Sequence, residues 1–181
     1  AFHDVTPVTG GVADAQEDGF VFRMSETPTT FDDPALKQAI KAGKHVFMEK
    51  PVCVDAPGFR KVMAAAALAD EKKLKVVVGL QRRYDQKYRE TIAKIREGVA
   101  GDIIGGQVYW NGGGIWYRGR KPDTTEMQFQ VNNWYHFNWL CGDHICEQHV
   151  HNLDVANWVL QNHPSDVVCL GGRQSRTDAR F

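Results

Sequence analysis

The segment Lys41-Ala-Gly-Lys-His-Val-Phe-Met-Glu-Lys-Pro51 contains the end of a helix, a strand and a turn in close succession. Gly43 is the kind of residue that ends a helix, and that helix has a start signal in Asp33 followed by Pro34. Residues 45–48 are mostly apolar, which predicts a short buried strand of a parallel sheet.

The same alternation of helix and strand continues on the C-terminal side. Asp55 predicts the start of an alanine-rich helix that runs to about Lys73, and residues 75–80 predict a second buried strand. Asp85 predicts a third helix, which Gly98 closes. Short links between these elements favour a parallel sheet of the α/β class, as in a partial Rossmann fold with a doubly wound sheet. On the N-terminal side, residues 21–24 are compatible with a strand remnant, but residues 1–31 as a whole show no periodicity because Thr-Pro, Gly-Gly and scattered acidic residues interrupt it.

The pattern changes after residue 101. Residues 103–110 predict a longer strand, and the glycine-rich and aromatic residues 111–117 predict a loop. A short helix is expected over 134–140, a longer helix over 147–161, and a final strand over 167–170. We therefore expect two units: a partial nucleotide-binding domain at 1–101, and at 102–181 the start of an α+β open-sheet domain.

Composition excludes several classes of protein. The chain has 181 residues, of which 43% are hydrophobic, and its net charge is zero, so neither disorder nor a general attraction to nucleic acid or anionic membrane is expected. Residues 37–100 carry fifteen basic and seven acidic side chains, an excess of +8 that favours an anionic ligand there unless it reflects exposed helix lysines. No apolar run is long enough for a membrane span. The four cysteines lack C-x-x-C spacing, which favours reduced thiols and a cytoplasmic location.

Lys50 is the first candidate functional residue. It follows a predicted buried strand, and ligands of open α/β sheets bind at the carboxyl ends of strands. Partial burial would let the ammonium relay a proton, whereas the alternative is a solvated lysine in a turn. Pro51 raises the possibility of a cis bond. Arg82 lies at the end of the next strand, where it would meet a phosphate or a carboxylate, or simply face water.

A second candidate group lies in the predicted C-terminal helix. Glu147 and His151 are four residues apart, so a carboxylate and an imidazole share a helix face, and Asp154 follows three residues later. Such a pair suits a base that removes a hydroxyl proton. One alternative is a helix-end salt bridge or a satisfied core histidine. Another is a metal site formed by His144, Glu147 and His151, although the segment lacks the order H-E-x-x-H.

Aromatic and amide side chains gather around the loop at 111–117. The group includes Trp116, Tyr117 and Asn133, and flat rings with nearby amides suit a sugar or polyol. The alternative is ordinary core packing, which we prefer for Trp110 and Trp158.

These motifs resemble the Gfo/Idh/MocA oxidoreductases. The resemblance rests on Thr27-Pro28, the block 41–51, residues 76–80 and the pattern from Glu147 to Asp154. It implies an NAD- or NADP-dependent dehydrogenase acting on a sugar, inositol or related polyol, which forms a homo-oligomer through its C-terminal sheet. By this resemblance the catalytic residues are Lys50, His151 and Glu147; the cofactor contacts are Thr27, Pro28, Glu49, Lys50, Pro51 and Gln81; and the substrate contacts are Arg82, Trp116, Tyr117, Asn133, His149 and Asp154.

Three features depart from that family pattern. Glu147 stands where aspartate is more common, and His149 stands where glycine is common, so the substrate is not transferable from a sugar dehydrogenase. No G-x-G-x-x-G lies before Lys50, so we expect an incomplete chain that binds a dinucleotide poorly by itself. Two other functions stay open: a glycosidase or lyase that recycles its NAD, and a non-catalytic oligomerising or ligand-binding relic.

Overall fold

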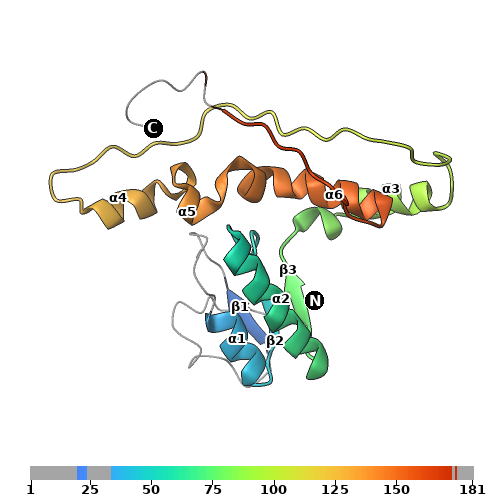
Figure 1. Ribbon diagram of the computed structural model, residues 1–181, viewed down its shortest axis with the longest axis horizontal. Helices are drawn as coiled ribbons and strands as arrows, with labels where there is room; N and C mark the ends of the chain where they lie inside the picture. Colours follow the sequence, from blue (N-terminus) through green and yellow to red (C-terminus); the bar gives the residue numbers. More distant parts are fainter. Residues whose placement is uncertain (1–19, 24–33, 173, 175–181) are drawn as a thin grey trace.

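A parallel three-stranded sheet forms the first unit. The computed structural model describes residues 20–23, 34–172 and 174. Its strands are β1 (Phe20–Arg23), β2 (His45–Met48) and β3 (Val76–Val78), in the order β1-β2-β3 with both pairs parallel. Helix α1 (Pro34–Lys41) connects the first two strands, and α2 (Ala56–Glu71) connects the last two (Figure 1). The predicted parallel α/β sheet is confirmed, with β3 shorter than the predicted 75–80.

The core of this unit lies on one face of the sheet. Both helices and β2 contribute to it through Leu36, Ala39, Ile40, Val46, Met48, Ala65 and Ala69. Ala65 and Ala69 are four positions apart, so they present one small-residue stripe on α2 to the strands. Val77 points to the other face and is 37% exposed, because side chains alternate along a strand. Asp55 caps α2 by accepting a hydrogen bond from the Gly58 N–H at 2.6 Å.

The third helix leaves the sheet. After β3 the chain forms a 3₁₀ turn, η2 (Gln81–Arg83), and then α3 (Gln86–Arg96), whose first N–H groups are capped by Asp85 as predicted. Helix α3 packs against α6 (Val150–Leu160) instead of the sheet (Figure 1). The boundary at residue 101 stays a prediction.

Helices dominate the second unit. They are α4 (Glu126–Asn132), η3 (Trp134–His136), α5 (Asn138–Cys141), a π-helical segment η4 (Ile145–His149) and α6, and they form a row above the sheet unit in Figure 1. The helix predicted over 147–161 is present as the end of η4 followed by α6. Its end is marked by Gln161, which has a left-handed φ of 53°. The short helix predicted over 134–140 is present as η3 and the first part of α5.

The two strands predicted after residue 101 are wrong. Within the described residues, the segments 103–110 and 167–170 are extended but belong to no sheet. Ile104 is 100% exposed and Val168 is 93% exposed. Apolar alternation gives a segment strand propensity, but a strand also needs a neighbour for its N–H and C=O groups, and no other described strand pairs with either segment. An open sheet in this unit therefore stays a prediction.

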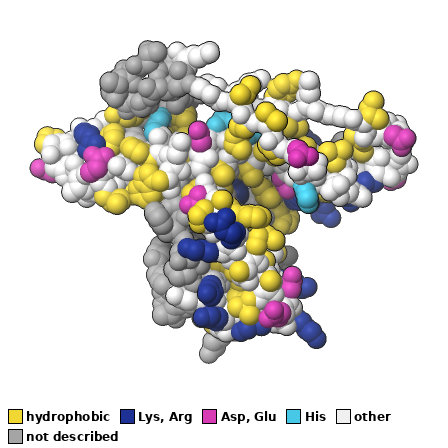
Figure 2. All heavy atoms as spheres, in the orientation of Figure 1, with side chains coloured by type: hydrophobic (Ala, Val, Ile, Leu, Met, Phe, Trp, Pro, Cys, Tyr) yellow, Lys and Arg dark blue, Asp and Glu magenta, His cyan; other side chains and the backbone are white. Residues whose placement is uncertain are grey.

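The basic excess of the middle third lies mostly on helix surfaces. Figure 2 shows Lys and Arg side chains over the unit that contains α1 and α2, and Lys37, Lys61 and Lys72 are exposed there. None of the described helices combines the length and the apolar character that a bilayer crossing requires. Cys53, Cys141, Cys146 and Cys169 are all free thiols.

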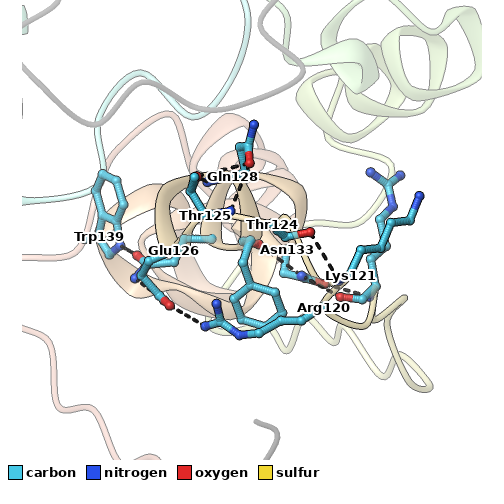
Figure 3. Close-up of polar contacts among 11 residues, drawn as sticks. Arg120, Lys121, Thr124, Thr125, Glu126, Gln128, Asn133 and Trp139 are labelled. Carbon is cyan, nitrogen blue, oxygen red and sulfur yellow. Dashed lines mark hydrogen bonds and ion pairs between the residues drawn. The ribbon is translucent and has the colours of Figure 1, made fainter.

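Helix α4 was not expected from the sequence, although a local signal for it exists. Thr125 and Gln128 form a capping box, in which each side chain bonds the backbone N–H of the other residue (Figure 3). Arg120 forms an ion pair with Glu126 at the start of this helix. Asn133, at its end, is completely buried and bonds the N–H of Arg118 at 2.8 Å.

Candidate active site

Lys50 and Glu147 join the two units. Lys50 lies two residues after the end of β2, and its peptide bond to Pro51 is cis. Its ammonium forms an ion pair with the Glu147 carboxylate and also donates to the Glu147 backbone carbonyl at 2.5 Å. The two side chains are only 16% and 8% exposed. Lys50 is therefore not the solvated turn lysine of the alternative interpretation, and its charge is held at the carboxyl edge of the sheet.

His151 lies one turn beyond Glu147 on the same helical run. It is 5% exposed, and its ring stacks on Trp110 with 5.8 Å between the ring centres. Burial lowers the pKa of His151 to about 4, and the positive charges of Lys50 and Arg82 add to the effect against the smaller opposing influence of Asp154. The imidazole is therefore neutral at neutral pH.

Three buried polar atoms in this cluster have no partner. They are Glu147 Oε2, His151 Nδ1 and Arg82 Nη1, none of which makes a hydrogen bond to another described residue. The Arg82 guanidinium lies 5.4 Å from the centre of the Trp110 ring that also stacks on His151. Buried polar atoms in native proteins are almost always bonded, so these three unpartnered atoms on residues that contact Lys50 or Trp110 indicate the place of a polar ligand.

Arg83 and Asp154 fix the helix that carries His151. Arg83 donates two hydrogen bonds to Asp154, both 2.8 Å long, and this pairing raises the pKa of the arginine. The guanidinium also lies 5.0 Å from the centre of the Trp158 ring. Because both Asp154 oxygens are engaged, the residue anchors α6 to η2, and its expected contact with substrate stays a prediction.

The expected cofactor contacts surround the same sheet edge only in part. Glu49 and Pro51 are half-buried beside Lys50, and the Glu49 carboxylate lies against Gly79, just after β3. Gly79 has no Cβ, which leaves room for that carboxylate. Gln81 is exposed at the start of η2. Thr27 and Pro28 lie outside the described residues.

A separate cavity of about 1110 Å³ lies beside the cluster, next to Trp110. Trp116 lines it as the sequence predicts for a polyol contact, whereas Tyr117, Asn133 and His149 do not line it. The full lining is Trp110, Asn111, Gly112, Gly113, Gly114, Ile115, Trp116, Tyr135, His136, Asn138, Asp143, His144, Gln148, Gly171 and Gly172.

Three of the expected substrate contacts have other neighbours. The Asn133 amide accepts from the Arg118 N–H and donates to the carbonyls of Arg118 and Phe129, both at 3.0 Å, so it fastens the loop to α4. Tyr117 packs edge-on against Phe129 and His136. His149 lies 5.7 Å from His144, ring centre to ring centre.

The alternative metal site is not formed by the described residues. No group of three or more His, Cys, Asp or Glu side chains gathers there in an arrangement that holds a metal ion. Glu147 binds Lys50 instead, and the His144 Nε2 atom lies 3.3 Å from the Trp110 carbonyl oxygen.

Comparison with known proteins agrees with this geometry. Residues 26–80 match the model of an oxidoreductase family with an NAD-binding Rossmann fold, GFO_IDH_MocA. The chain belongs to the Gfo/Idh/MocA oxidoreductase family. The matched segment contains β2, Lys50 and β3, which are the elements that build the lysine side of the cluster.

The similarity to known proteins extends beyond residues 26–80. The chain is 47% identical over 124 residues to an inositol 2-dehydrogenase of Pseudomonas syringae, and 48% identical over 125 residues to one of Azotobacter vinelandii. These matches cover 68% and 69% of this chain but only 30% of each relative. A scyllo-inositol dehydrogenase of Lactobacillus casei, solved with bound NAD(H) and scyllo-inositol, shares the fold. Its TM-score is 0.54 at 23% identity, over 81% of this chain and 38% of that one.

Trp110 is the main site residue that sequence reasoning missed. Instead of a core residue it is a half-buried ring that contacts His151 and lines the cavity. Its position directly before the glycine-rich loop was the available signal. The cavity residues Asp143 and Gln148 carried no such signal, because Asp143 lies in the left-handed turn before η4 and Gln148 lies in the π-helical turn itself.

Proposed function

We propose that this chain forms the lysine and histidine side of the active site of an NAD-dependent inositol dehydrogenase. The observation that carries the proposal is the set of three unpartnered buried atoms on Arg82, Glu147 and His151, which contact either Lys50 or Trp110. The family match and the inositol dehydrogenases among the relatives support it. The chain spans less than half the length of the relatives it matches, so the activity belongs to the whole enzyme.

The residues fit a bound dinucleotide at the carboxyl edge of the sheet. Lys50 and the neighbouring Glu49 and Pro51 lie at that edge, where ligands of open parallel sheets bind, and they would face the nicotinamide. Thr27, Pro28 and Gln81 are proposed to contact the same cofactor, on the family resemblance. A bound NAD supplies the acceptor for the hydride that leaves the substrate carbon.

The chain's own residues handle the substrate hydroxyl. Neutral His151 accepts the hydroxyl proton, which a protonated imidazole would be unable to do. The Lys50 ammonium stabilises the negative charge that develops on the substrate oxygen. Glu147 holds that ammonium through one carboxylate oxygen and leaves the other, Oε2, to accept a hydrogen bond from a neighbouring hydroxyl of the ring.

The remaining features follow from the family resemblance. We place the division between a nucleotide-binding unit and a substrate unit at residue 101, and we expect the second unit to mediate homo-oligomerisation. Free thiols at Cys53, Cys141, Cys146 and Cys169 favour the reducing environment of the cytoplasm.

The test is a measurement of NADH formation with myo-inositol by the intact enzyme. Lys50→Met and His151→Gln should each lower kcat/KM by about a hundredfold or more, the range that general acid–base groups contribute. Lys75→Met is the matched control, because it removes an exposed lysine from the segment before β3 and should keep the activity. Wild-type activity in either site variant would exclude that residue from the mechanism, and the absence of NADH with any inositol would exclude the dehydrogenase.

A further inference from the structure

The cavity beside Trp110 does not contain the proposed reaction centre. Lys50, Glu147 and His151 are absent from its lining, although the Trp110 ring belongs to both places. A substrate ring that presents a hydroxyl group to His151 therefore lies outside this cavity. The cavity and the proposed reaction centre share Trp110, so a group bound in the cavity would lie next to that residue and not among Lys50, Glu147 and His151.

The size of the cavity exceeds what one polyol ring needs. Its volume of about 1110 Å³ lies just above the roughly 300–1,000 Å³ found for sites that hold drug-sized ligands. A second ring fits this space, and the reacting ring would lie beyond Trp110.

The lining is suited to an uncharged, hydroxyl-rich ring. Trp110, Trp116 and Tyr135 supply flat aromatic faces, and contacts of Trp116 with Trp134 and Tyr135 at about 5.5 Å hold that ring in place. The side-chain amides of Asn111, Asn138 and Gln148 make no hydrogen bond to any other described residue. No lysine or arginine is among the described residues that line the cavity, so this part of the lining offers a phosphate or a carboxylate no cationic partner.

One acidic group adds to these amides. Asp143 lines the cavity with a left-handed φ of 65°, and one of its carboxylate oxygens accepts the N–H of His144 at 2.7 Å. Its remaining lone pairs can accept from sugar hydroxyls, while the three amides both donate and accept. Aromatic faces combined with a carboxylate and free amides recognise a neutral sugar.

We propose that this cavity is a subsite for a glycosyl unit attached to the polyol, so that the substrate is a glycosylated inositol and not the free ring. The proposal rests on the proposed function for the position of the reacting ring. The cavity itself is defined by residues that take no part in the proposed chemistry.

The experiment compares galactinol, a galactosyl inositol, with myo-inositol. Isothermal titration calorimetry on the full chain without NAD measures binding, and NADH formation by the intact enzyme measures kcat/KM. Galactinol should bind roughly tenfold more tightly than myo-inositol, the gain expected from one well-packed aromatic contact. Trp116→Ala should remove most of this preference, and Asn138→Ala, an exposed position, serves as a second variant if the first does not fold. Tyr109→Ala is the control, because that exposed ring lies outside the lining.

The outcomes separate this proposal from the proposed function. Equal affinity for the two ligands, or a galactinol preference that survives in Trp116→Ala and Asn138→Ala, would overturn the subsite. Calorimetry needs no turnover, so a preference that depends on Trp116 would support the subsite even if neither ligand yields NADH. Release of free galactose without net NADH would support the subsite and replace the dehydrogenase by NAD-recycling bond cleavage.

Discussion

The buried imidazole of His151 makes the stability of the protein depend on pH. Its folded-state pKa of about 4 lies below the ordinary value of 6.5, chiefly because burial disfavours the charged form. Below pH 6.5 the unfolded chain therefore binds a proton that the folded chain does not. The contribution of His151 is complete above pH 6.5 and is lost as the pH falls from 6.5 to 4.

The size of this effect follows from the two pKa values. The gap between about 4 and 6.5 corresponds to about 3 kcal/mol once the pH is well below 4. Between pH 7 and pH 5, the same linkage lowers the free energy of unfolding by about 2 kcal/mol. This is a large fraction of the 5–15 kcal/mol that is typical of a folded domain.

Urea unfolding at pH 7 and pH 5 measures the effect against His151→Gln, which has no imidazole at this position. The stability difference between wild type and variant should change by about 2 kcal/mol between the two pH values. His149→Gln is the matched control, because it removes an imidazole two positions earlier without touching the stack on Trp110. If wild type and His151→Gln show the same pH dependence, or if NMR shows the His151 ring titrating above pH 6, the reasoning is refuted.

Three further predictions concern the elements that position the site. Gly142→Ala should destabilise the protein by about 2 kcal/mol in denaturant titrations, because the φ of this residue is 70° and the added Cβ would lie 2.6 Å from the Cβ of Cys146. A decrease of less than about 0.5 kcal/mol in the free energy of unfolding would contradict this. Thr125→Ala should cost about 1 kcal/mol through loss of the cap on α4, and Thr125→Ser should restore it. Asp154→Asn should weaken the ion pair with Arg83 by about 1 kcal/mol and lower kcat/KM. The difference in stability between wild type and variant should shrink at high salt, and a difference that is independent of salt would argue against the ion pair.

The sheet unit was predictable because its signals are local. Asp55 and Asp85 cap the helices that follow them, and the apolar residues 45–48 form β2 with the expected bounds. A cap and a buried strand each depend on a few neighbouring residues, so their sequence is sufficient. Lys50 was placed at the sheet edge for the same reason, since it directly follows that strand.

Features that depend on distant partners were not predictable in this way. The segment 103–110 has strand periodicity, but no described strand lies beside it to pair with its backbone N–H and C=O groups. The π-helical turn at 145–149 changes the simple four-residue spacing on which the pairing of Glu147 with His151 was based. Asn133 looked like a polyol contact because it is an amide among aromatic rings, and only the fold shows that Arg118 and Phe129 use its hydrogen bonds.

The ion pair between Lys50 and Glu147 also has a consequence for biosynthesis. The two residues are 97 positions apart, and the ribosome adds about 5–20 residues per second, so the carboxylate follows the lysine by roughly 5–20 s. During that interval the nascent chain carries a lysine at the end of β2 with no counter-charge from Glu147. Translation that stops before Glu147 would therefore release polypeptides that contain the β2 segment but lack half of the site.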